Sequence, residues 1–199
     1  MALDDIRADI AYVKDLVDEG GDGPRLRGGV WMTVAGVVFS VTSALVWWTT
    51  SHHLATGWWI AGMWFAGSLV CNVLGMAFTA RLPRARGAPG RALYSIGAAI
   101  SLTLGALFCA GIVTSVATHN YGVWALFPSV VLAVYGSFWY GSAVITRERW
   151  RHAVAGGSFA AAVFFPIVAT RPEGYLIFAV LLTLLATLPG VVILRTKRA

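Results

Sequence analysis

The stretch LYSIGAAISLTLGALFCAGIVTSVA, residues 93–117, contains no Asp, Glu, Lys or Arg. As an α-helix it would be about 37 Å long, whereas the hydrocarbon core of a bilayer is about 30 Å thick. A charged group at the centre of a spanning helix costs about 2.5–3.5 kcal/mol, so the absence of charge over this length is typical of a segment surrounded by lipid. We predict that residues 93–117 form a transmembrane helix.

Five other stretches are also long, apolar and without charge. The chain of 199 residues is 58% hydrophobic and 12% charged, whereas charged residues make up about 25% of an average soluble domain. The stretch 153–170 is short and rich in Ala and Gly, so we expect it to lie inside the bundle. The sequence therefore predicts an all-α integral membrane fold, a bundle of six transmembrane helices over residues 29–195 in a lipid bilayer. The five further spans are 29–50, 57–79, 121–145, 153–170 and 174–194.

The basic residues predict the orientation of these helices. Fourteen of the fifteen fall on one side of the six predicted spans, and Arg171 alone falls on the other. Cytoplasmic loops carry the excess of Lys and Arg, so both termini are expected in the cytoplasm. Thirteen of the fifteen are Arg, which suggests a GC-rich bacterial genome and hence a bacterial inner membrane. The fourteen are Arg7, Lys14, Arg25, Arg27, Arg81, Arg84, Arg86, Arg91, Arg147, Arg149, Arg151, Arg195, Lys197 and Arg198.

The chain also reads as three tandem hairpins, each of which starts at a basic segment and returns through an outer turn with little charge. A hinge at residues 20–28 precedes the first span, and a basic tail at 196–199 follows the last. Pro166 and Pro189 are expected to kink the last two helices, because proline removes a helix hydrogen bond.

Residues 1–19 are predicted to form a short cytoplasmic amphipathic helix. Its polar face is acidic, so an anionic lipid surface would repel it. We expect it to dock on the protein's own basic loops or on a second chain, as a homo-oligomer or with a protein partner, with a solvated helix as the alternative. Its apolar seam consists of Leu3, Ile6, Ile10, Val13 and Val17, and its acidic residues are Asp4, Asp5, Asp9, Asp15, Asp18 and Glu19.

Small residues at four-residue spacing mark two predicted helix-packing faces. One comprises Gly67, Cys71 and Gly75 in the second span; the other comprises Gly97, Ser101, Gly105 and Cys109 in the third. Small side chains let helix backbones approach closely, which is how helices associate in lipid. We expect these faces to build the bundle, with a dimer interface as the alternative.

A few polar or aromatic side chains fall within the spans. Such groups usually hydrogen-bond between helices. The alternative is a small cavity for an uncharged or lipophilic ligand, lined by Trp64, Asn72, Tyr135 and Trp139.

Several classes of function are excluded because their chemical groups are missing from the spans. An ion-coupled pump usually keeps an ionisable group there, a retinal protein needs a lysine and a membrane cytochrome needs histidine pairs. No phosphate-binding loop or hydrolase motif is present, so we predict neither an enzyme nor a cofactor. We predict no metal site; the alternative is a zinc or copper site in the outer turns, with the ligands His52, His53, His119 and Glu173.

The leading hypothesis is a non-enzymatic membrane protein with an interaction, regulatory or structural role. A transporter or channel for a small uncharged solute is the first alternative, and a metal site on the outer face is the second. The basic loops are explained by topology and anionic lipid, so no nucleic-acid partner is expected.

Overall fold

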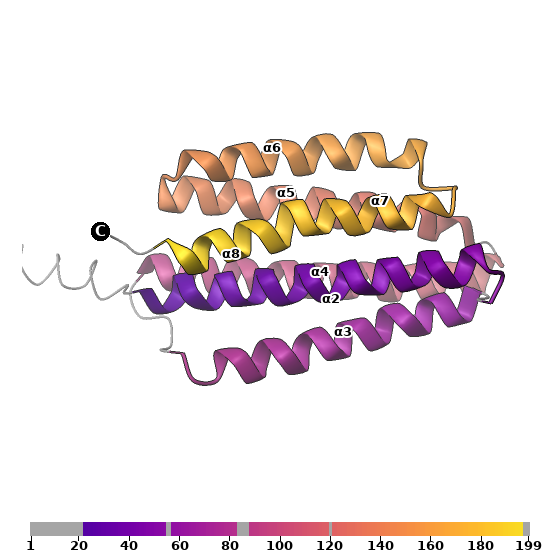
Figure 1. The fold of residues 1–199 in the computed structure, drawn as a ribbon, viewed down its shortest axis with the longest axis horizontal. Coiled ribbons are helices and arrows are strands. Elements are labelled where there is room, and N and C mark those ends of the chain that lie inside the picture. Colours follow the sequence, from indigo (N-terminus) through magenta and orange to yellow (C-terminus); the bar gives the residue numbers. More distant parts are fainter. Residues whose placement is uncertain (1–21, 55–56, 83–87, 120, 197–199) are drawn as a thin grey trace, which may run out of the picture.

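The computed structural model describes residues 22–54, 57–82, 88–119 and 121–196, and within these ranges it is all-helical, with no strand (Figure 1). The predicted helix at 1–19 with its seam, part of the hinge and most of the basic tail lie outside the described residues. The elements are α2 (Asp22–Ser51), α3 (Gly57–Thr79), α4 (Ala88–Thr118), the 3-10 helix η1 (Tyr121–Ala125), α5 (Phe127–Thr146), α6 (Arg149–Phe164), the 3-10 helix η2 (Phe165–Ile167), α7 (Glu173–Leu182), the π-helical η3 (Thr183–Thr187) and α8 (Leu188–Arg195).

Five of the described helices are long and apolar enough to cross a membrane, so this is a multi-pass membrane protein by helix composition. Many large apolar side chains on their outer surfaces are exposed; Leu102 of α4, for example, is 75% exposed. Lipid rather than water is the solvent that such a surface suits. The five segments are Leu26–Ser51, Gly57–Thr79, Ala92–Thr118, Phe127–Thr146 and Glu173–Arg195.

The fifth predicted span, 153–170, differs from its prediction: it does not lie inside the bundle but packs along α5 at the edge, with Val163 71% and Phe164 66% exposed (Figure 1). α6 begins earlier, at Arg149, and its α-helical part ends at Phe164, which makes it 16 residues long. Pro166 lies in the 3-10 turn η2 that follows. Because proline has no N–H to donate to the carbonyl four residues back, the α-helix ends there instead of continuing to residue 170.

Two other boundaries differ for local reasons. α2 already begins at Asp22, within the predicted hinge 20–28, and Pro24 is tolerated because the first turn of a helix has no intrahelical acceptor for its N–H groups. The predicted span 121–145 is divided: η1 precedes α5, and Pro128 lies in the first turn of α5. In both places a proline marks the start of a helix.

The helices run along one axis and reverse direction from each to the next, as in three tandem hairpins (Figure 1). However, the last hairpin is not a packing unit, because α7 and α8 pack along α2, while α6 packs along α5. α2 is the central helix, with α3 on one side and α7–α8 on another. The chain therefore closes its bundle by bringing the last span against the first.

The interior contains two clusters of buried apolar side chains. One joins Leu132, Phe165, Phe178 and Leu182 near one end of the bundle. The other joins Trp139, Ala155 and Ile193 near the opposite end. Both clusters include residues of α5 and of the last span, so these two segments form the core that holds α6 in place.

Candidate functional site

The small residues of α3 lie against α2. Gly67, Cys71 and Gly75 are buried, with Thr79 one turn further on the same face. A Cβ atom added at Gly75 would lie 2.3 Å from the Trp31 ring. One added at Gly67 would lie 2.6 Å from Oγ1 of Thr42. The absence of side chains at these positions is thus what lets α2 and α3 approach each other.

The small residues of α4 lie on an open surface. No atom of the surroundings comes within 4 Å of a Cβ added at Gly97 or Gly105. Ser101 and Cys109 are exposed, and the Ser101 hydroxyl donates to the Gly97 carbonyl of its own helix at 3.0 Å. The face predicted from Gly97, Ser101, Gly105 and Cys109 therefore does not pack against the described part of this chain.

A second close contact joins α2 to the last span. A Cβ added at Gly36 would lie 2.5 Å from the backbone nitrogen of Thr187. The Ser40 hydroxyl donates to the Ala179 carbonyl at 2.9 Å and lies 3.0 Å from the Thr183 hydroxyl. Here a glycine and short hydroxyl side chains bring two backbones together and supply hydrogen bonds between them.

The last span contains a π-helical segment, Thr183–Thr187, just before Pro189. Proline cannot donate to the carbonyl four residues back, which is that of Leu185. The indole N–H of Trp139, a fully buried side chain of α5, donates to this carbonyl at 2.9 Å. Trp139 thus satisfies the acceptor that Pro189 leaves without its helical partner.

The four residues predicted to line a ligand cavity lie in different surroundings. Trp64 packs between Phe39 and Phe178, each with its ring centroid 6.0 Å away. Trp139 belongs to the other buried cluster, and Tyr135 is buried on α5. Asn72 is exposed, and its side-chain amide donates to the Ser68 carbonyl at 2.8 Å. Asn72 therefore lies apart from the three aromatic residues.

The outer-turn residues also have local roles. Nδ1 of His52 lies 2.8 Å from the Trp48 carbonyl oxygen, and its ring packs on the Trp48 ring. His53 and His119 adopt left-handed backbone conformations just after α2 and α4, with φ of 54° and 50°. Glu173 is in the first turn of α7. Over the described ranges, no group of three or more His, Cys, Asp or Glu residues is placed to hold a metal ion.

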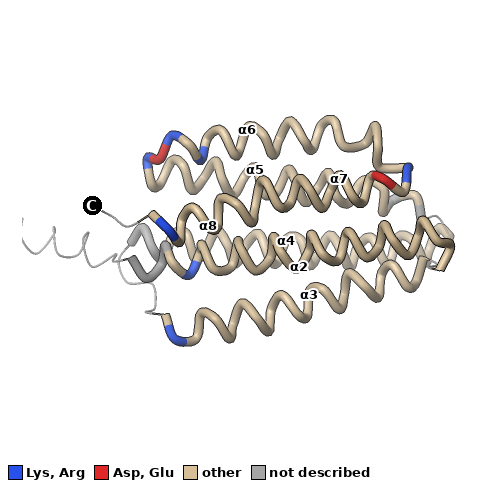
Figure 2. Tube along the Cα trace, in the orientation of Figure 1, with Lys and Arg blue, Asp and Glu red and all other residues tan. Residues whose placement is uncertain are grey.

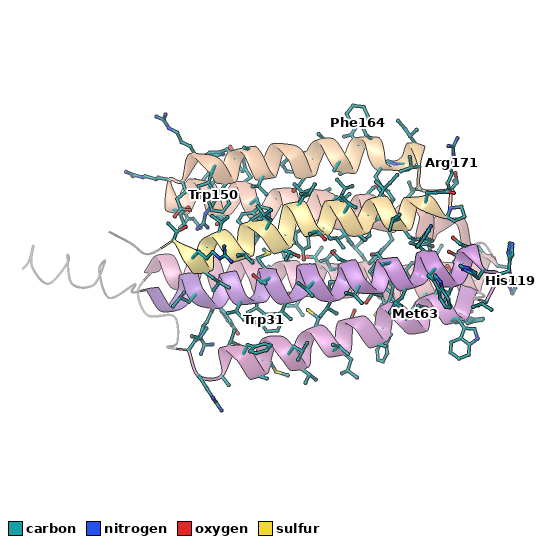
Figure 3. All side chains as sticks on the ribbon, viewed as in Figure 1. Trp31, Met63, His119, Trp150, Phe164 and Arg171 are labelled. Carbon is teal, nitrogen blue, oxygen red and sulfur yellow. The ribbon has the colours of Figure 1, made fainter. Side chains whose placement is uncertain are left out.

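Most of the charged residues in the described ranges lie at one end of the bundle (Figure 2), whereas Arg171 and Glu173, just before and at the start of α7, lie at the other. Trp150 marks the same end as the basic residues, and His119 lies with Arg171 at the opposite end (Figure 3). We call the end that holds most of the charged residues the basic end. By their positions near the ends of the helices, its described arginines are Arg27, Arg81, Arg147, Arg149, Arg151 and Arg195.

Two arginines of the basic end are held by the bundle itself. Arg151 is 4% exposed; its Nε donates to Glu148 at 2.7 Å, and it also donates to the buried Ser142 hydroxyl. Trp150 donates to the same Glu148 oxygen at 2.9 Å. Arg27 donates to the Leu82 carbonyl, which ties α2 to the segment after α3. These contacts hold Leu82, just after α3, and Glu148, between α5 and α6, to the helices.

The other four arginines of the basic end, Arg81, Arg147, Arg149 and Arg195, are exposed. They come from the ends of α3, α5 and α8 and from the start of α6. Charged residues at or next to the ends of four different helices thus lie at one end of the bundle. Such a surface attracts acidic groups, whether of a lipid, a partner or this chain.

We did not predict two contacts, the one between Glu148 and Arg151 and the one between Trp139 and the Leu185 carbonyl, although the sequence contains a signal for each. Glu148 and Arg151 are three residues apart, a spacing at which opposite charges on a helix meet. Pro189 identifies Leu185 as a carbonyl that needs another donor. Nothing in the sequence identifies Trp139 as that donor, because α5 and the last span meet only in three dimensions.

Comparisons with protein-family models, with curated proteins and with solved structures found no match to this chain.

Proposed function

We propose that this chain is a non-enzymatic protein of a bacterial inner membrane that acts through its basic end, on the cytoplasmic side. In this proposal the membrane is crossed six times. α6 has 16 residues and would span about 24 Å, and η2 adds about 6 Å, which together match a core about 30 Å thick. Both termini are then in the cytoplasm, as the distribution of basic residues favours.

The main support for this proposal is the set of four exposed arginines at the end of the bundle where α2 begins. Residues 1–21 connect directly to α2 at Asp22, so this acidic segment is attached to the basic end. Six carboxylates lie between Asp4 and Glu19. Attraction between opposite charges, together with a very high effective concentration of the tethered segment, favours docking on the chain's own arginines. We propose that this docking controls access of partners to the basic end.

A cysteine at position 80 would report both the orientation of the protein in the membrane and whether residues 1–21 cover the basic end. Ala80 is exposed and adjoins Arg81, so Ala80→Cys adds a thiol without removing a charge. Cys71 and Cys109 are replaced by alanine in this background. In intact cells, an impermeant maleimide should leave position 80 unlabelled and should label Leu54→Cys at the opposite end. In permeabilised membranes, deletion of residues 1–21 should raise the labelling rate at position 80 severalfold.

Matched charge variants distinguish loss of the docking of residues 1–21 from a general destabilisation of the protein. Arg149→Gln combined with Arg195→Gln should raise labelling at position 80 as the deletion does, whereas Arg171→Gln should leave it unchanged. Labelling of position 80 from outside intact cells would disprove the orientation. An unchanged rate after the deletion would disprove the docking and leave the orientation intact. A rate that depends on protein concentration would show docking on a second copy.

Passage of a small uncharged solute is a second candidate function, favoured by the π-helical segment in the last span. π-helical turns inside α-helices occur frequently at functional sites. Trp139→Phe removes the hydrogen bond to Leu185 and should alter solute passage if this segment moves during transport. The measurement is glycerol-driven swelling of proteoliposomes, and swelling equal to that of protein-free liposomes would contradict this candidate.

A further inference from the structure

A small hollow lies where the start of α3 approaches the end of α4 and η1. It has a volume of about 10 Å³ for a water-sized molecule, which is room for one water. Its position is at the end of the bundle opposite the basic end. The residues that line it are Gly57, Trp58, Ala61, Ile112, Ser115 and Trp124.

The hydroxyl of Ser115 is the polar group of this hollow that needs a partner. Ser115 is 2% exposed, and its Oγ has no hydrogen-bond partner among the described residues. Other hydroxyls of α3 and α4 donate to the carbonyl four residues back: Ser68 does so at 2.9 Å and Thr118 at 2.7 Å. Because Ser115 does not follow this pattern, its hydroxyl remains available to a molecule in the hollow.

The α3 wall of the hollow supplies a further donor. Gly57 is the first residue of α3 and lines the hollow, and the first N–H groups of a helix have no acceptor within that helix. Trp124 lines the hollow together with Ser115. Its ring lies over α4, because a Cβ added at Gly111, one turn before Ser115, would be 3.0 Å from that ring. The hollow thus has polar groups on α3 and α4 and an aromatic ring along its side.

We propose that one water molecule binds in this hollow and links α4 to the first turn of α3. The water oxygen accepts from the backbone N–H of Gly57, and the Ser115 hydroxyl exchanges a hydrogen bond with the same water. Direct contact between α3 and α4 is sparse, so this water supplies a polar link at a place where the two helices hardly touch. The site is independent of the docking proposed at the basic end.

The first test compares two serine variants of the full-length protein in nanodiscs. Ser115→Ala should lower the melting temperature by about 2–4 °C, because it removes a hydrogen bond to the bound water. Ser129 provides the matched control: its Oγ is also buried without a partner in the described part of the chain, but it does not line the hollow. Ser129→Ala should leave the melting temperature unchanged or raise it.

The second test detects the water itself by hydroxyl-radical footprinting with short X-ray pulses. Radicals formed from bound water label the nearest side chains, so Trp124 should be labelled in the wild type and much less in Ser115→Ala. Labelling of Trp139, which lies in the other half of the bundle, should not change. A melting temperature that Ser115→Ala leaves unchanged or raises would overturn the proposal, and so would Trp124 labelling that is unaffected by this substitution.

Discussion

α3 and α4 carry small residues at the same four-residue spacing, yet only those of α3 are buried. Cys71 of α3 is 5% exposed, whereas its counterpart Cys109 on α4 is exposed. Gly75 lies against the Trp31 ring, while no neighbouring helix among the described residues comes within 4 Å of the Cβ position of Gly105. The two faces look alike in sequence and differ in their neighbours.

The difference teaches that a small-residue spacing predicts the capacity to pack and does not identify the partner. α3 follows α2 through a short turn and returns along it, so its small face meets the central helix. α4 lies on the outside of the bundle and contacts mainly α5 and, to a lesser degree, α2. Its small face is therefore left to lipid or to another chain.

The largest expected effect is the difference in reactivity between the two cysteines. Cys109 should react with N-ethylmaleimide many times faster than Cys71 in native, detergent-solubilised protein, because α2 covers Cys71 whereas only detergent covers Cys109. Mass spectrometry of the peptides measures both. After denaturation in SDS, both should react fully, which provides the control. Equal rates for the two cysteines in the native protein would contradict this difference between the two faces.

The stabilities of the Gly75→Ala and Gly105→Ala variants test the same difference between the small-residue faces of α3 and α4. The new methyl group at position 75 would overlap the Trp31 ring, which lies 2.3–2.6 Å from the Cβ position, and overpacking of this kind costs about 1–3 kcal/mol. At position 105 the methyl group meets open space and alanine favours the helix, so stability should be unchanged or slightly higher. Thermal unfolding of both variants in the same detergent is the measurement. A comparable loss for both would disprove the difference between the faces.

The long charge-free runs predicted the fold class well, because charge is expensive in lipid wherever the helix lies in the bundle. Local features account for most boundary differences: Pro166 ends α6, and Pro128 marks the start of α5. By contrast, the packing of the last span on α2 could not be predicted. It depends on contacts between residues as distant in sequence as Gly36 and Thr187.

The functional residues were harder to predict for the same reason. The basic residues could be assigned to one end, but the sequence does not distinguish Arg151, which is buried beside Ser142 and Glu148, from the exposed Arg149. Likewise, Ser115 reads like any other serine in a span. Whether a hydroxyl bonds to its own helix or is left to another partner depends on the neighbouring helices.

The smallest effect is expected for Gly67→Ala, on the same face as Gly75. The atom nearest to the new methyl group is Oγ1 of Thr42, at 2.6 Å, and the Thr42 side chain can rotate away. Rotation gives up the hydrogen bond from this hydroxyl to the Val38 carbonyl, now 2.9 Å long, so the cost should be about 0.5–1.5 kcal/mol. Thr42→Ala combined with Gly67→Ala should recover part of that loss, because the overlapping atom is then gone. If Gly67→Ala costs as much as Gly75→Ala and the second substitution recovers nothing, the limit at this face is the separation of the helix backbones rather than one side chain.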